Sequence, residues 1–306
     1  MFPPLLAGVL MMAAAPPVQA APAPPALEHF TVTSDGHPMS VWARRAASPK
    51  GTVLFVHGMT WSARPDFDLQ VPGLQRSVLA SFAARGYAAY AVDLRGYGDT
   101  PRDATGWLTP RRAAADVANV LTWIAQQHRS LPPPALVGWS RGACISMLTA
   151  EIKPTAVSAL VLFGFVFDPD ATFGDVEVPV EPQRDKNTAD SAASDFISPA
   201  VTPSIVVRSF VEQALKADPI RIDLKGDAEY NDLKPGRVKV PTLVLYGEKD
   251  PGISFDDAGK FFAKLGTPDR QMVVLPGADH AAQLEDTHDR WVAAIVDFLS
   301  RPAVHH

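Results

Sequence analysis

The chain has 306 residues, of which 47% are hydrophobic and 20% are charged, and its formal net charge is −5 at pH 7. This balance is typical of a globular protein, and the length suffices for one large α/β domain or two smaller ones. The net negative charge, with no basic run longer than Arg111-Arg112, argues against nucleic acid or an anionic membrane as the main partner. Both of those partners require clustered lysine and arginine.

The first 20 residues contain no charged side chain and include an apolar stretch at 5–15. That stretch is too short to span a bilayer, and the small residues Val18 and Ala20 before Ala21 are typical of signal-peptidase cleavage. We expect residues 1–20 to be a signal peptide, which makes the protein periplasmic or secreted and leaves no integral membrane segment. Residues 21–27 are then a Pro-rich tether. A disordered or anchoring N-terminus is the alternative.

Between residues 28 and 300, short apolar runs alternate with helical patterns. Strands are predicted at 40–44, 52–56, 88–93, 135–137, 159–163, 242–246 and 272–275. Helices are predicted at 73–85, 110–128, 141–151, 255–265 and 289–299. Most of these strands lack polar alternation, which is typical of central strands covered on both faces. The order of elements predicts an α/β fold with a doubly wound, mostly parallel sheet.

The alternation breaks between Asp168 and Lys239, where a polar, Pro-rich stretch precedes one further predicted helix at 203–216. The break is too long for a plain loop in a compact domain. We expect residues 168–239 to be an insertion that covers one end of the sheet, with a partly disordered loop as the alternative. The sequence contains no internal repeat and no Cys/His cluster with metal-ligand spacing.

Ser140 lies in the stretch "GWSRG", which joins the predicted strand at 135–137 to the predicted helix at 141–151. A serine on so sharp a turn has a strained backbone, and glycines two residues before and after it relieve crowding between strand and helix. The turn lifts Oγ above the sheet, beside the free N–H groups of a helix N-terminus. We interpret Ser140 as a nucleophile rather than a capping serine. Cys144, the only cysteine, cannot form an intrachain disulfide, and we expect it to be a small core residue.

A serine nucleophile needs a base, and the base needs an acid to orient it. His280 follows the predicted strand at 272–275 after a short turn, and Asp250 follows the strand at 242–246. Because the ends of neighbouring parallel strands lie side by side, we predict His280 as the base and Asp250 as the acid. Asp168 is the runner-up acid, and Glu248 comes one step too early. The weaker histidine candidates are His57, His128, His288, His305 and His306.

The oxyanion of an acyl-transfer reaction needs two preorganised N–H donors. One candidate is the backbone N–H of Arg141, at the start of the predicted helix. The other is the backbone N–H of Met59, in the loop after the predicted strand at 52–56.

Four stretches resemble, in order, the motifs of the α/β-hydrolase fold superfamily in its serine-nucleophile branch: "LFVHGMT", "VDLRGYGDTP", "VGWSRGA", and the late pair "YGEKD" and "LPGADH". The resemblance covers roughly residues 51–299, and the chain order Ser, Asp, His matches as well. It implies an eight-stranded-type sheet within a domain at 28–300 and a lid at about 168–239. It further implies a triad of Ser140, Asp250 and His280, with Met59 and Arg141 lending N–H groups, and no cofactor or metal.

The resemblance implies hydrolysis of a small-molecule carboxylic ester or lactone through an acyl-enzyme. A proline-iminopeptidase-like aminopeptidase and a carbon–carbon bond hydrolase are alternatives in the same superfamily, and a non-catalytic ligand receptor is a remote one. The candidates for holding a substrate amine, weighed against a solvated acidic loop, are Asp168, Asp170, Asp175, Glu177 and Glu181.

The side chain of Arg141 places positive charge at a helix N-terminus, which is unfavourable by about 0.3–1 kcal/mol when exposed. We therefore expect it to point away from the acyl carbon and to pair with a carboxylate from the loops around Asp99 or Glu248. Contact with an anionic group of a substrate is the alternative.

Overall fold

The computed structural model describes residues 23–165, 167–172 and 179–302. The predicted signal peptide at 1–20 and the first two residues of the predicted tether lie outside these ranges. Residues 23–27 precede the first strand without regular secondary structure. Within the described ranges, no helix is both long enough and apolar enough to cross a membrane.

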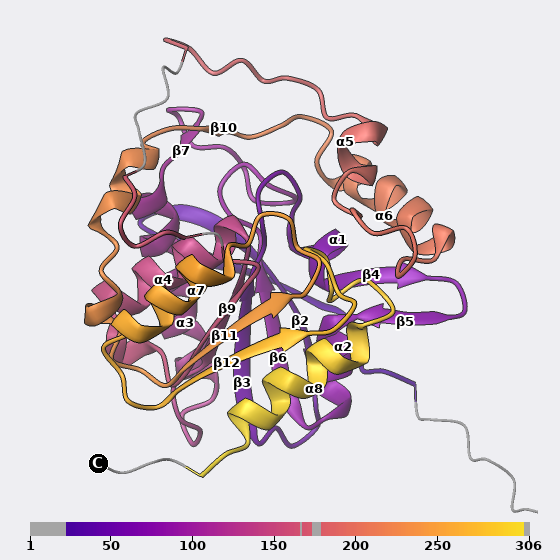
Figure 1. The fold of residues 1–306 in the computed structure, drawn as a ribbon. Helices are drawn as coiled ribbons and strands as arrows, with labels where there is room; N and C mark the ends of the chain where they lie inside the picture. Colours follow the sequence, from indigo (N-terminus) through magenta and orange to yellow (C-terminus); the bar gives the residue numbers. More distant parts are fainter. Residues whose placement is uncertain (1–22, 166, 173–178, 303–306) are drawn as a thin grey trace, which may run out of the picture.

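An eight-stranded sheet runs through the centre of the fold (Figure 1). In spatial order its strands are β1 (Glu28–Ser34), β2 (His37–Arg45), β6 (Tyr87–Val92), β3 (Gly51–Val56), β8 (Ala135–Trp139), β9 (Leu160–Phe163), β11 (Thr242–Gly247) and β12 (Arg270–Leu275). β2 is antiparallel to β1 and β6, and the other neighbouring pairs are parallel. The predicted fold class is therefore confirmed, and every predicted strand is present.

Helices cover both faces of the sheet (Figure 1). One face carries α3 (Pro110–Gln127), α4 (Arg141–Ile152) and α7 (Phe255–Lys264), and the other carries α2 (Val78–Ala84) and α8 (His288–Leu299). In β3, Leu54 and Val56 belong to the core under α3 and α4, whereas Val53 and Phe55 belong to the opposite core. Successive side chains of a strand point to opposite faces, so a strand covered twice is apolar throughout.

β1 is the one strand of the central sheet that the apolar-run pattern misses. It is an edge strand whose alternate residues are exposed, so its apolar content is low. A two-residue turn at Asp35 and Gly36, both with positive φ (48° and 78°), joins it to β2. An Asp-Gly pair is a strong local signal for such a hairpin, and it was present in the sequence.

The predicted helix at 73–85 is wrong in its first part. Leu74–Ser77 forms β5, which pairs antiparallel with β4 (Asp68–Val71), and α2 begins only at Val78. β4 follows directly after the short helix α1 (Ala63–Phe67). In β5, Arg76 Nε donates to Leu284 O at 2.9 Å, a contact across more than 200 residues that no local pattern encodes.

The chain between β9 and β11 runs past the carboxyl ends of the central strands (Figure 1). Within residues 168–239 the structure describes α5 (Ala189–Ala193), α6 (Ser204–Ala217), β10 (Asp223–Leu224) and short 3₁₀ helices at Asp227–Asp232 and Pro235–Arg237. β10 pairs with β7 (Trp107–Leu108), which follows β6 in the chain. A further 3₁₀ turn at Pro154–Ala156 follows α4. α6 confirms the helix predicted at 203–216.

The first turn of α4 lies directly against the end of β3. A Cβ atom built at Gly142 would lie 2.3 Å from His57 O and 2.4 Å from Val56 O, and one at Gly138 would lie 2.3 Å from Gly142 O. These are backbone atoms, which cannot swing aside as a flexible side chain would. Both glycines are therefore required by close approach between strand and helix.

We expect Gly142→Ala to destabilise the protein by at least about 1–3 kcal/mol, the usual cost of overpacking. Gly259→Ala in α7 is the matched control, because nothing lies within 4 Å of the added Cβ. That variant should gain about 0.5–1 kcal/mol, since alanine loses less entropy than glycine in a helix. Urea unfolding followed by circular dichroism measures both. A Gly142→Ala variant as stable as the wild type would contradict the packing described above.

Candidate active site

Ser140 occupies the turn between β8 and α4 and is the N-cap of α4. Its backbone has φ 54° and ψ −124°, a region that residues with a side chain rarely occupy. Its N–H donates to Phe163 O at the end of β9 at 2.8 Å, which holds the turn in place. The strained strand-to-helix turn is the geometry that the sequence pattern predicts for Ser140.

His280 and Asp250 are brought together at the ends of β12 and β11. His280 Nδ1 lies 2.7 Å from Asp250 Oδ2, and the N–H of Gly252 donates to Asp250 Oδ1 at 3.0 Å. The Asp250 side chain is 2% exposed and that of His280 is 20% exposed. A carboxylate only accepts hydrogen bonds, so Nδ1 carries the hydrogen and Nε2 is left as the basic nitrogen.

The His280 ring lies against Trp139, the residue before Ser140. The two ring centroids are 5.6 Å apart, and Trp139 Nε1 donates to the backbone carbonyl of His280 at 2.7 Å. A Cβ built at Gly164 would lie 3.0 Å from His280 Cε1 and 3.4 Å from Trp139 Cδ1. The base predicted from the sequence is thus held over the end of β9, on the side of the sheet edge where Ser140 lies.

Arg141 directly follows Ser140, and the turn that leads into Met59 lies against it. Gly58 precedes Met59, and a Cβ built on it would lie 3.4 Å from Ser140 Cβ. Neither amide has an acceptor among the residues that the structure describes. Two free N–H groups beside a serine are suited to holding a developing oxyanion.

The turn that carries Met59 is fixed by the loop after β6. Thr60 has φ 87°, an unusual value for a β-branched residue, and its N–H donates to Tyr97 Oη at 3.4 Å. His57 also connects this turn to the loop after β6. Its Nε2 accepts from the N–H of Leu94 at 3.1 Å, and its Nδ1 donates to Gly58 O at 2.9 Å. Burial lowers the pKa of His57 to about 4, so it is neutral and supports the turn.

The loop after β6 is in turn held by a buried aspartate. Asp93 accepts hydrogen bonds from Trp42 Nε1 and from the N–H of Ala63, both at 2.9 Å, and from the N–H of Asp99 at 3.2 Å. Burial raises the pKa of Asp93 to about 7, while these donors oppose the rise. Asp93 therefore ties this loop to the start of α1.

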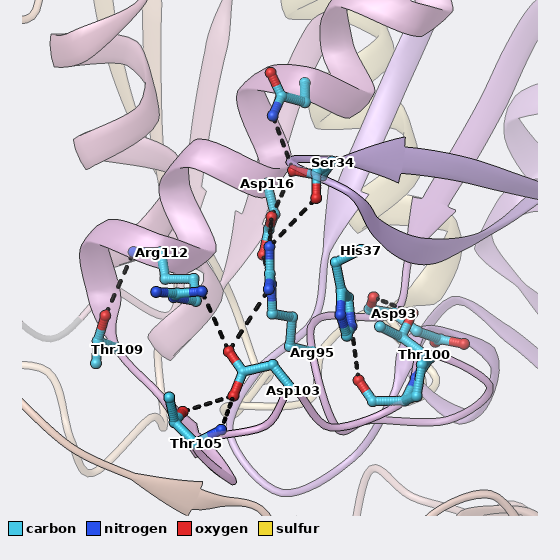
Figure 2. Close-up of polar contacts among 12 residues, drawn as sticks. Ser34, His37, Asp93, Arg95, Thr100, Asp103, Thr105, Thr109, Arg112 and Asp116 are labelled. Atoms are coloured by element: carbon cyan, nitrogen blue, oxygen red, sulfur yellow. Dashed lines mark hydrogen bonds and ion pairs between the residues drawn. The ribbon is translucent and has the colours of Figure 1, made fainter.

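An ion-pair cluster around Arg95 also anchors this loop (Figure 2). Arg95 Nε and Nη2 lie 2.6 and 2.8 Å from the two carboxylate oxygens of Asp116 on α3, and Nη1 lies 3.6 Å from Asp103. Ser34 Oγ also donates to Asp116 at 2.6 Å. Since Arg95 and Asp116 are both buried and their geometry is bidentate, the loop is fixed to α3 and to the edge of the sheet.

The other acids and histidines considered for the site have different partners. Asp168 Oδ1 accepts from the N–H of Asp170 at 2.9 Å, and the exposed Glu248 accepts from the N–H of Gly277 at 2.8 Å. His128 Nε2 bonds Tyr90 Oη, and the ring of His288 bonds Ser81 and Gln283. His305 and His306 lie outside the described residues.

Asp195, at the end of α5, is a site residue that the sequence did not single out. Its carboxyl group lies beside Trp61 and within electrostatic reach of His280, and burial raises its pKa to about 6. The next residue, Phe196, packs on Phe210 of α6, which packs on Trp61. Of the other acidic residues weighed as holders of a substrate amine, Asp170 pairs with Lys264 and Glu181 is exposed, while Asp175 and Glu177 lie outside the described residues.

The side chain of Arg141 pairs with a carboxylate, as expected. The partner is Asp227, whose two oxygens lie 3.2 and 2.5 Å from the guanidinium, and not Asp99 or Glu248. The guanidinium also lies 5.2 Å from the centre of the Tyr230 ring. The identity of the partner was hidden because Asp227 comes from the 168–239 segment, 86 positions away.

Cys144 is buried in the core as predicted, and burial raises the pKa of its thiol to about 12. It is therefore protonated and unreactive near neutral pH. In the described ranges, no group of three or more His, Cys, Asp or Glu side chains is arranged to hold a metal ion.

We expect Arg141→Gln to lower the free energy of unfolding by about 1–2 kcal/mol, because the lost ion pair is mostly buried but not fully. Adding Asp227→Asn to this variant should lower the free energy of unfolding little further, because the Asp227 carboxylate has already lost its partner Arg141. The exposed pair of Arg111 and Asp232 provides the control: Arg111→Gln should change stability by less than about 0.5 kcal/mol. If Arg141→Gln leaves urea unfolding unchanged and raises KM only for anionic substrates, the structural role is refuted.

Comparison with known proteins agrees with this geometry. The family model of the alpha/beta hydrolase family matches residues 53–295. The AB hydrolase superfamily protein YisY of Bacillus subtilis is 26% identical over 250 residues, which is 76% of this chain and 86% of that protein. The monoacylglycerol lipase of Mycolicibacterium smegmatis is 26% identical and covers 76% and 81% of the two chains. The alignment with a relative from rat spans less than half of that protein, 42% of its length.

The solved esterase EaEST from Exiguobacterium antarcticum superposes with a TM-score of 0.63 at 20% sequence identity. The match covers 90% of this chain and 100% of that one. At this identity the likeness concerns the fold. Together with the family match over most of the sequence, it leads to one conclusion: the chain belongs to the alpha/beta hydrolase family.

Proposed function

We propose that the protein is a serine-dependent carboxylesterase that cleaves a small to medium ester or lactone through an acyl-enzyme intermediate. The observation that carries the proposal is the hydrogen bond between His280 and Asp250, formed beside the strained turn of Ser140. The two free amides next to the serine supply the remaining requirement, a place for an oxyanion. Similarity to a monoacylglycerol lipase supports the same class of reaction.

In the proposed mechanism, Ser140 Oγ attacks the acyl carbon while its proton passes to His280 Nε2. The Asp250 carboxylate holds the imidazole through Nδ1 and stabilises the imidazolium that forms. The oxyanion of the tetrahedral intermediate accepts hydrogen bonds from the N–H groups of Met59 and Arg141. Each such donor is typically worth about 10²–10³ in rate.

Collapse of the intermediate expels the alcohol, which takes the proton from His280, and leaves an ester between the acyl group and Ser140. A water molecule then gives a proton to the same imidazole and attacks the acyl carbon. The second tetrahedral intermediate releases the acid and returns the proton to Ser140 Oγ. Each proton moves between serine, histidine, alcohol and water, so the cycle needs no cofactor.

A second candidate activity is aminopeptidase cleavage, because Asp195 places a carboxyl group near His280. In that reaction the free amine of a substrate would pair with a carboxylate close to the catalytic base. The ester reaction makes no such demand, so the two candidates differ in whether Asp195 matters for substrate binding.

Ser140→Ala should abolish labelling by a fluorophosphonate probe and lower the turnover of nitrophenyl esters by about 10⁴-fold or more. His280→Ala should have a comparable effect. Ser158→Ala, at the amino-terminal edge of the parallel strands, is the matched control and should behave like the wild type. Labelling and turnover are measured on the same preparations, and their survival in Ser140→Ala would eliminate the mechanism.

A panel of nitrophenyl esters and proline arylamides separates the two candidate activities. We expect ester turnover without arylamide turnover, and little change in KM for neutral esters in Asp195→Asn. Arylamide turnover whose KM rises in Asp195→Asn would instead establish the aminopeptidase. Stoichiometric ligand binding with no turnover of either class would point to a receptor.

A further inference from the structure

Two fully buried carboxyl groups lie beside His280 and are not used by the proposed mechanism. They belong to Asp279, the residue before His280, and Glu285, five residues after it. The N–H of Asp279 donates to Glu285 Oε2 at 3.1 Å, so the two buried residues are in direct contact, and each carboxyl group affects the pKa of the other. Ionising both carboxyl groups of such a pair in a dry site is unfavourable, so one of them holds a proton.

The surrounding donors decide which carboxyl group holds that proton. Asp279 accepts hydrogen bonds from the N–H of Ser198 at 2.6 Å and from the N–H of Ala281 at 3.0 Å, and such donors lower its pKa. Glu285 Oε1 has no donor in the described part of the chain. Burial and the adjacent Asp279 raise the pKa of Glu285 to about 9. Glu285 is therefore the protonated member and Asp279 the charged one.

The pair sits where three parts of the fold meet. Ser198 belongs to the 168–239 segment, so its hydrogen bond to Asp279 attaches that segment to the loop that carries His280. A second bond, from the N–H of Asp286 to Val201 O at 2.9 Å, attaches the same two segments a few residues away. The backbone of the His280 loop also meets the end of β11, because the N–H of Lys249 donates to Ala278 O at 2.8 Å.

Other groups near the loop are already paired with different partners. Arg76 of β5 binds Leu284 O and the exposed Asp286, and the ring of His288 is bonded to Gln283 and Ser81. Asp195 faces His280 and Trp61. Thr287 Oγ1 donates to Glu285 Oε2 at 3.3 Å but carries no charge. The charged group that acts on Glu285 is therefore Asp279.

We propose that Asp279 and Glu285 are positioning residues: the proton held by Glu285 lets Asp279 keep its charge and bind Ser198 and Ala281, which sets the place of His280. When that proton is lost, two adjacent carboxylates repel each other and the loop that carries the base shifts. The catalytic consequence rests on the proposed function, whereas the proton held by Glu285 does not.

The activity test compares three variants across pH. In the wild type, kcat/KM for a nitrophenyl ester should fall at alkaline pH with a midpoint near 9. Glu285→Gln keeps a neutral side chain of the same size that cannot ionise, so it should retain most of kcat at neutral pH and lose the alkaline fall. Glu285→Ala should lower kcat by about 10- to 100-fold with KM little changed, because a misplaced base slows chemistry more than binding. Glu248→Gln, a carboxylate on the neighbouring loop, should match the wild type throughout.

The stability test needs no turnover and separates the two proposals. Between about pH 5 and pH 9, Glu285 is protonated in the folded chain and ionised in the unfolded chain, so the free energy of unfolding falls as pH rises. Glu285→Gln should flatten this slope by about one proton, as measured by urea unfolding at a series of pH values. Glu248→Gln should leave the slope unchanged.

Two results would overturn the inference. One is a wild-type pH slope of stability identical to that of Glu285→Gln, which would mean that Glu285 does not hold the proton. The other is a Glu285→Ala enzyme with unchanged kcat per site that reacts with fluorophosphonate, which would mean that the pair does not position His280. If the wild type neither turns over esters nor labels, the proposed function fails, and the stability test still decides whether Glu285 holds the proton.

Discussion

The close approach of α4 to the end of β3 is the constraint on which the rest of the site depends. Gly142 lies so near Val56 O and His57 O that no side chain fits there, and Ser140, two residues earlier, has the strained backbone of the turn between β8 and α4. The same approach brings the Gly58 turn against Ser140. The strained serine and the turn that leads into Met59 therefore meet at one packing contact between a helix and a strand.

Around this contact, the loops at the carboxyl edge of the sheet are held by buried aspartates. Asp93 accepts N–H groups from α1 and from its own loop, Asp218 accepts those of Ser62 and Gly98 at 2.8 Å, and Asp279 accepts those of Ser198 and Ala281. A carboxylate that receives several backbone N–H groups fixes loops that have no regular secondary structure. Burial raises the pKa of Asp93 and Asp218, and the N–H donors oppose that rise.

Much of the fold and of the site can be read from the sequence because the signals are local. Central strands covered on both faces appear as apolar runs, and α3 is marked by Thr109, which caps it, and Pro110, its first residue. Ser140, Asp250 and His280 each follow a strand of the parallel sheet, and parallel strands place their ends at one edge. The structure brings His280 and Asp250 together at 2.7 Å for this reason.

The features that the sequence analysis predicted wrongly or missed have a different cause, because they depend on contacts between distant parts of the chain. β5 was read as helix because its strand character depends on pairing with β4 and on the contact of Arg76 with a loop more than 200 residues away. The partner of Arg141 and the position of Asp195 both come from the 168–239 segment, whose path over the sheet edge is set by packing such as that of Phe196 on Phe210.

The sequence by itself identified the strands after which the candidate triad residues lie, the residues of that triad and the need for glycine on either side of Ser140. These follow from the short-range geometry of strands and tight turns. Only the tertiary structure decided which carboxylate neutralises Arg141, which acid lies near His280 and that Asp279 contacts Glu285. Charges and hydrogen-bond donors acquire their partners through burial and long-range contact, and no local pattern of residues records those distances.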